Sequence, residues 1–167
     1  MTMPGLPTRF DTRAGFLDAL RAGLALARAE GLPMAWVDED FVDWPLGEAG
    51  WVAALTEWVQ ASTRARLRLF ARRHDAVAQR HPRFVGWRQR FDHRLEARVL
   101  RAEEDAPLPG LLLCGEVLAV RLLDRERWRG RTVRAQEEPV EMQRLRQQIE
   151  AVWQRGEPGF PASHLGL

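Results

Sequence analysis

The sequence predicts a single-domain α/β sandwich, in which helices flank a mixed sheet of five or six strands. Segments with helical periodicity alternate with short apolar or alternating segments in the first half, and predicted strands cluster in the second half. The chain has 167 residues, of which 46% are hydrophobic and 29% charged, as is usual for one globular domain. The expected order is α-β-α-β-α-α-β-β-β-(β)-α.

The first half contains two amphipathic helices, each followed by a strand. Asp11 or Thr12 caps a helix that ends near Glu30, because Gly31 suits the position after a helix. Residues 34–39 (MAWVDE) form a short apolar run typical of a buried strand. A second helix spans about 48–61, and its stripe of tryptophans and aliphatic residues is interpreted as core. Residues 64–69 then alternate strictly and predict a strand with one arginine face: Arg64, Arg66 and Arg68.

The second half alternates less regularly. A short helix is expected at 72–80, and Pro82 suits the first turn of another. The alternation in HRLEARVL (93–100) predicts a strand, and LLLCG and EVLAVRLLD predict two strands joined by a tight turn near Gly115, with RTVRAQ a further candidate strand. The last helix runs from about Glu137 to Gly156. We therefore expect a flexible leader at 1–10, one domain at 11–156 and a tail at 157–167.

Several function classes are disfavoured by composition. The chain lacks a run of about 18 apolar residues and a visible signal peptide, so no membrane association is expected. The single cysteine, Cys114, lies in an apolar run, which favours a buried thiol and a reducing cytoplasm. All 25 basic residues are arginine, so no lysine is available for a Schiff base or a phosphate loop.

Charge is distributed unevenly along the chain. Residues 29–61 hold seven acids and no arginine, whereas residues 62–101 hold twelve arginines against three acids. This asymmetry predicts either an anionic partner or pairing between the acidic 38–48 and basic 64–101 segments, within one chain or across a homodimer.

The candidate anion-binding residues all lie in the basic segment: Arg64, Arg66, Arg68, Arg72, Arg73, His81 and Arg83. The corner at His81–Arg83 opens a helix, where backbone N–H groups favour a phosphate. Alternatively, His81 and Arg83 fix the corner by bonding to the acidic segment at 38–43. The spacing of His74, His81 and His93 matches no known metal site, so neither a metal nor a cofactor is expected.

Four segments carry a resemblance to a known family: ARLRLF, QRHPRFVGWRQRFDHRLEARVL, LLLCGEVLAVRLLD and the closing IEAVWQRGEPGFPASHLGL. With the elements between them, they resemble a single, degenerate phospholipase D-like domain, similar to small bacterial proteins and to domains attached to acetyltransferase-like proteins. In that superfamily a histidine attacks phosphorus, and a lysine two residues later neutralises the phosphate oxygens. This chain has no lysine, and its corresponding strand, residues 111–114, is wholly apolar.

The resemblance and the charge pattern lead to two functional hypotheses, neither of them catalytic. The first is a phospholipase D-like module that binds a phosphate-bearing ligand, with nucleic acid as the candidate, through its arginine-rich surface. The second is a structural or interaction protein without a ligand, which forms a homodimer by pairing its acidic and basic segments. Because the superfamily's enzymes combine two motifs from two domains or a dimer, the resemblance also implies self-association.

Overall fold

The computed structural model describes residues 8–100 and 108–160. In these ranges eight strands form one mixed sheet in the order β1-β7-β6-β5-β2-β3-β4-β8. The strands are β1 (Arg9–Phe10), β2 (Met34–Asp38), β3 (Leu67–Ala71), β4 (Leu95–Val99), β5 (Gly110–Cys114), β6 (Leu118–Asp124), β7 (Arg129–Arg134) and β8 (Glu157–Pro158). The helices are α1 (Arg13–Glu30), α2 (Ala49–Ala61), α3 (Asp75–Arg80), α4 (Pro82–Arg90) and α5 (Pro139–Arg155), with a 3-10 turn at Asp92–Arg94.

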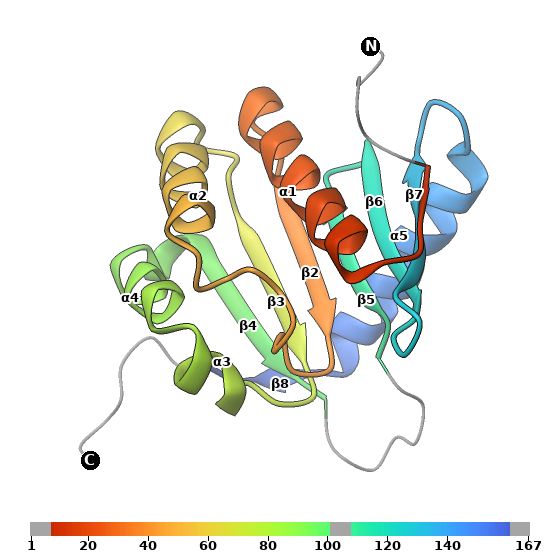
Figure 1. The fold of residues 1–167 in the computed structure, drawn as a ribbon. Helices are drawn as coiled ribbons and strands as arrows, with labels where there is room; N and C mark the ends of the chain where they lie inside the picture. The colour runs from red at the N-terminus through yellow and green to blue at the C-terminus, as the bar shows by residue number, and fades with distance from the viewer. Residues whose placement is uncertain (1–7, 101–107, 161–167) are drawn as a thin grey trace.

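Helices cover both faces of the sheet (Figure 1). The strands β2, β3 and β4 are parallel, and α1, α2 and α4 lie on the near side of the sheet in the view shown, whereas α5 lies on the far side. Each face has its own apolar core, one beneath α1, α2 and α4 and the other beneath α5. The expected α/β class and the flanking helices are therefore confirmed.

Local signals in the sequence account for most element boundaries. The Thr12 hydroxyl accepts a hydrogen bond of 3.0 Å from the Gly15 amide at the start of α1, and Gly31 ends that helix in the left-handed conformation with φ 63°. Pro82 occupies the first turn of α4, and Gly115 makes the tight turn between β5 and β6 with φ 48°. Six of the seven tryptophans are buried, as expected: Trp36, Trp44, Trp51, Trp58, Trp87 and Trp153.

Three expectations are corrected. The sheet has eight strands, because two-residue strands at its edges, β1 and β8, are too short to give a sequence pattern. The strand expected at 64–69 is β3, Leu67–Ala71, since a turn closed by the Ala65 amide and the Ser62 carbonyl precedes it. The helix expected at 72–80 begins only at Asp75, because the amides of Arg72 and Arg73 bond the carbonyl of Glu39 instead.

The predicted boundaries of the domain, at residues 11 and 156, stay predictions, but both flanking segments contain residues of the sheet. Phe10, in the expected leader, is buried and pairs with Gly130 of β7. Glu157 and Pro158, in the expected tail, pair with Val99 and Arg98 of β4. In the described part of the chain, no helix is both long and apolar enough to cross a membrane.

Alanine substitutions at two glycines should have opposite effects on the free energy of unfolding. A Cβ atom at Gly130 would lie 2.2 Å from the Arg121 carbonyl oxygen and 2.3 Å from Cζ of Phe10, so Gly130→Ala should lower the free energy of unfolding by about 2 kcal/mol or more. Gly86 lies inside α4 with nothing within 4 Å of such an atom, so Gly86→Ala should raise it by roughly 0.5–1 kcal/mol. Urea unfolding of both variants measures these changes, and equal effects would contradict the packing described at β7.

Candidate anion-binding site

Three of the predicted arginines line one cleft on the α5 face of the sheet. Arg64, Arg66 and Arg68 lie beside the amino ends of β2 and β3, and the cleft has a volume of about 870 Å³. Helix α5 forms the opposite wall with Arg146 and three polar neighbours, Gln143, Gln147 and Glu150. The Arg68 guanidinium also packs 4.9 Å from the ring centre of Trp153, which fixes that arginine on the α5 face. We call this feature the arginine cleft.

The arginine cleft has more positive than negative charge. Glu150 pairs with Arg68 at 2.9 Å, and Glu116 pairs with Arg146 at 2.8 Å. Arg64 and Arg66 are exposed, and neither forms an ion pair with a described residue; Arg66 donates only to the His93 carbonyl, at 3.3 Å. Two guanidinium groups are therefore available to an anion, with ten N–H donors between them of which the His93 carbonyl accepts one, and guanidinium binds phosphate oxygens in a bidentate manner.

The other four predicted residues lie at the opposite end of the strands, beyond the carboxyl ends of β2 and β3. Arg72 pairs with Glu39 through a contact of 3.0 Å, and the backbone amide of Arg73 bonds the Glu39 carbonyl. The acidic and basic segments thus meet within one chain at Glu39 and Arg72. The seven predicted residues do not form one site, because the length of β3 separates them: Arg68 lies near the start of the strand beside α5, and Arg72 directly follows its end.

His81 and Arg83 hold the loop that follows β2. The His81 Nε2 atom lies 3.0 Å from the Phe41 carbonyl oxygen, and the Arg83 guanidinium donates to the Gly47 carbonyl at 2.9 Å. His81 is buried, with 7% of its surface exposed. The His81 bond matches the alternative in which the corner is tied to the segment at 38–43, although its partner is a backbone carbonyl and not a carboxylate, whereas the Arg83 partner, Gly47, lies beyond that segment.

An ion pair that the sequence analysis did not predict lies at the same end of the strands, around a buried carboxylate. The Asp38 carboxylate is fully buried; it accepts from the Arg125 guanidinium at 2.5 Å and from the Phe41 amide at 2.8 Å. Burial raises the pKa of Asp38, and the Arg125 charge and the amide bonds oppose that rise. Arg125 lies 87 positions away in the sequence, and no local pattern links the two residues. The cleft arginine Arg146 was missed for the same reason.

Loss of Arg125 should be costly because it leaves a buried carboxylate without its cation. We expect Arg125→Ala to lower the free energy of unfolding by about 2–3 kcal/mol. Arg127 provides the control on the same turn, since its pair with Asp124 is screened by solvent and its removal should change stability little. Chemical denaturation compares the two variants, and an Arg125→Ala protein as stable as Arg127→Ala would contradict the importance of the pair.

His74 is a second buried polar group at the carboxyl ends of these strands. Its Nε2 atom lies 3.1 Å from the Arg98 carbonyl oxygen, and its Nδ1 atom has no hydrogen-bond partner among the described residues. Burial lowers the pKa of His74 below the 6.5 of an exposed histidine, because protonation would place an unpaired N–H and a charge in the core. The histidine is therefore neutral in the folded protein near neutral pH.

The lowered pKa of His74 makes folding stability depend on pH. As pH falls below about 6.5, the unfolded chain binds a proton at this residue before the folded protein does, so the free energy of unfolding decreases. Above that pH His74 is neutral in both states and contributes no slope. Denaturation at a series of pH values should show this decrease in the wild type and a smaller one in His74→Gln; identical slopes would argue against a neutral buried His74.

Other candidate chemistry finds little support in the geometry. In residues 8–100 and 108–160, no three histidine, cysteine, aspartate or glutamate side chains gather in a way that could hold a metal ion. Cys114 is fully buried, its thiol donates to the Gly23 carbonyl at 3.1 Å, and burial raises its pKa well above the usual range. This thiol is protonated and inaccessible.

Comparison with known proteins bears on the fold. No protein-family model matches the chain, and no curated protein matches it. NucT from Helicobacter pylori, a phospholipase D-family protein, has a similar structure, with a TM-score of 0.54 and 6% identity over 91% of this chain and 97% of NucT. The fold is phospholipase D-like. The expected fold class is thereby confirmed.

The phospholipase D-like fold also matches part of a larger protein. TrmBL2, described as an archaeal chromatin protein with a novel mode of DNA binding, has a TM-score of 0.58 and 12% identity over 95% of this chain. The match covers 56% of TrmBL2, so the chain spans little more than half the length of that protein. At these identities the two likenesses concern the fold alone.

Proposed function

We propose that this protein is a non-catalytic phospholipase D-like module that binds the phosphate backbone of nucleic acid in its arginine cleft. The observation that carries the proposal is that Arg64 and Arg66 lie exposed in one cleft without a carboxylate partner among the described residues. Side chains that neutralise phosphates release counterions, which favours binding. Arginine contacts to phosphate hold a strand without reading its bases, so the binding is expected to be largely independent of sequence.

Nucleic acid is favoured over other polyanions by the fold-level analogy to TrmBL2, whose description includes DNA binding. The shape of the cleft is also suitable, because it runs along the amino ends of two strands and one flank of α5 and is open to solvent. Such a surface suits an extended backbone better than it suits a small enclosed ligand.

The absence of catalysis is proposed from the residues themselves. The chain has no lysine, so the histidine-and-lysine motif of phospholipase D enzymes cannot be formed. Strand β5, which corresponds to the motif strand in the resemblance, is buried throughout and ends in Cys114. His74 and His81 are buried with their Nε2 atoms on backbone carbonyls, which leaves them poorly placed to attack phosphorus. We further propose a cytoplasmic protein of bacterial type, a location that suits its single buried cysteine.

Fluorescence anisotropy with a short labelled duplex tests the proposed function. The wild type should bind at about 50 mM salt, and its affinity should fall steeply as salt increases. Arg64→Ala/Arg66→Ala should weaken binding by about tenfold or more and reduce the slope of log affinity against log salt by about 2, because two phosphate contacts are lost.

The matched control removes two arginines from the opposite face. Arg21 and Arg28 lie on α1 in exposed ion pairs with Glu48 and Glu57, so Arg21→Ala/Arg28→Ala changes net charge equally without touching the cleft. This control should keep the wild-type salt slope. No binding by the wild type at about 50 mM salt, or equal losses in the two double variants, would refute the proposed site.

A further inference from the structure

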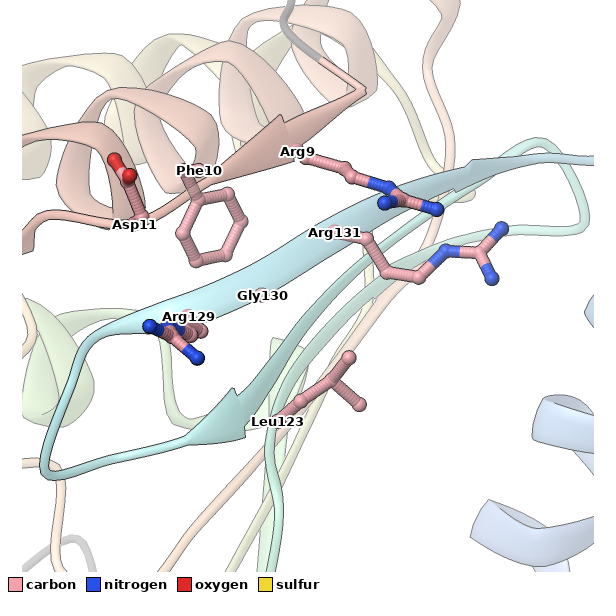
Figure 2. Close-up of a pocket in the computed structure, with 7 residues that line it drawn as sticks. All are labelled: Arg9, Phe10, Asp11, Leu123, Arg129, Gly130 and Arg131. Carbon is pink, nitrogen blue, oxygen red and sulfur yellow. The ribbon is translucent and has the colours of Figure 1, made fainter.

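A second group of arginines lines a pocket at one lateral edge of the sheet, where β1 pairs with β7 (Figure 2). The pocket has a volume of about 640 Å³ and is lined by Arg9, Phe10, Asp11, Leu123, Arg129, Gly130 and Arg131. It shares no lining residue with the arginine cleft. We call it the edge pocket.

Strand register brings like charges together beside the edge pocket. Arg9 of β1 lies directly opposite Arg131 of β7, and Arg131 lies directly opposite Arg121 of β6. Figure 2 shows the guanidinium groups of Arg9 and Arg131 extending in the same direction from the two strands. Like charges at directly opposed positions of neighbouring strands destabilise a sheet, so this row of three arginines costs free energy unless anions offset it.

Carboxylates offset only the inner part of this row. Glu141 of α5 pairs with Arg121 at 3.1 Å but also with Arg144, and Glu138 pairs with Arg131. Burial lowers the pKa of Arg121, and the charges of Arg144 and Arg131 lower it further, whereas the charge of Glu141 opposes the fall.

Two of the three arginines that line the edge pocket have no carboxylate partner of this kind. Arg9 and Arg129 are both exposed, and neither forms an ion pair with a described residue. Asp11 lines the pocket, but no ion pair links it to any of the three pocket arginines, and in Figure 2 the Phe10 ring lies between its carboxylate and Arg9. Two guanidinium charges in one concave site thus remain uncompensated in the described part of the chain.

We propose that the edge pocket binds a phosphate monoester, held by Arg9 and Arg129 and assisted by Arg131. A phosphate monoester carries a charge of about −1.5 to −2 at neutral pH, which matches the two uncompensated arginines. Guanidinium groups offer paired N–H donors to phosphate oxygens. The ester carbon chain or sugar would lie against Leu123, which is 58% exposed and supplies the apolar wall of the pocket.

This site goes beyond the proposed function and does not depend on it. A phosphate monoester reaches the pocket either as a free nucleotide or as the 5′-terminal phosphate of a nucleic-acid strand. An internal phosphodiester carries a single negative charge and fits the charge of the edge pocket less well. The chemistry that the pocket recognises is the same for both sources.

Isothermal titration calorimetry with adenosine 5′-monophosphate tests the proposal, with adenosine as the ligand that lacks the phosphate. The wild type should bind the monophosphate and not adenosine. Arg9→Ala/Arg129→Ala should weaken binding by about tenfold or more, since hydrogen bonds to charged groups are lost. Arg9→Lys/Arg129→Lys keeps the charge but not the paired donors, so it should bind with intermediate affinity.

Two controls separate this site from the arginine cleft. Arg64→Ala/Arg66→Ala and Arg21→Ala/Arg28→Ala should both bind the monophosphate as the wild type does. Circular dichroism confirms folding of each variant. The source of the phosphate is identified by comparing the affinities of a single strand with a 5′-phosphate and the same strand with a 5′-hydroxyl. Tighter binding of the 5′-phosphate strand by the wild type, lost in Arg9→Ala/Arg129→Ala, identifies a strand end. Equal affinities identify the free nucleotide.

The site is overturned if the wild type fails to bind adenosine 5′-monophosphate at about 10 mM, or if it binds adenosine equally well. It is also overturned if Arg9→Ala/Arg129→Ala binds as the wild type does. None of these results affects the duplex experiment on the arginine cleft, because that experiment depends on different residues.

Discussion

The Asp38 carboxylate at the carboxyl end of β2 holds together the part of the sheet where the chain changes direction. It is fully buried, and its two oxygens accept from the Arg125 guanidinium and from the amides of Asp40 and Phe41. A buried carboxylate is tolerated only when its hydrogen bonds are satisfied in this way. The pair joins the loop after β2 to the turn between β6 and β7, which are distant in sequence. The pair thus adds a side-chain link between two parts of the sheet that the backbone pairing of β2 with β5 already joins.

The loop that Asp38 organises in turn anchors the helices on the near face of the sheet. Phe41 adopts a positive φ of 59°, and its ring lies 4.9 Å from the ring of Trp44 in an edge-on contact. Its carbonyl oxygen meets His81, which begins the turn into α4. A non-glycine residue in the left-handed region is unfavourable on its own, so the surrounding bonds must maintain it. The histidine and arginine at 81–83 are therefore part of the framework of this face.

Arginine has two different roles in this lysine-free chain. Many arginines are structural: Arg98 stacks 4.5 Å from the ring centre of Trp153, and Arg94 donates to the carbonyls of Ser62 and Ala65. A planar guanidinium group can serve such packing and bonding roles at the same time. The arginines proposed to bind a ligand are those that line a cleft without an ion-pair partner in the described part of the chain: Arg64 and Arg66 in the arginine cleft, and Arg9 and Arg129 in the edge pocket. Under both proposals, a ligand binds where a cleft holds guanidinium charge that the fold leaves uncompensated, and the density of arginine along the sequence does not locate such a place.

The sequence by itself determined the fold class, the helices α1, α2, α4 and α5, the approximate positions of the strands β2 to β7 and the burial of most tryptophans, because these follow from periodicity and capping within a few residues. It also identified Arg64, Arg66 and Arg68 as one arginine face. Tertiary structure alone decided which arginines are paired and which are free, since the carboxylates that pair with Arg68, Arg146 and Arg125 come from distant parts of the chain: Glu150, Glu116 and Asp38. The edge strands β1 and β8 likewise form only through pairing with distant strands. Arg9 became a candidate ligand-binding residue because strand register places it opposite Arg131.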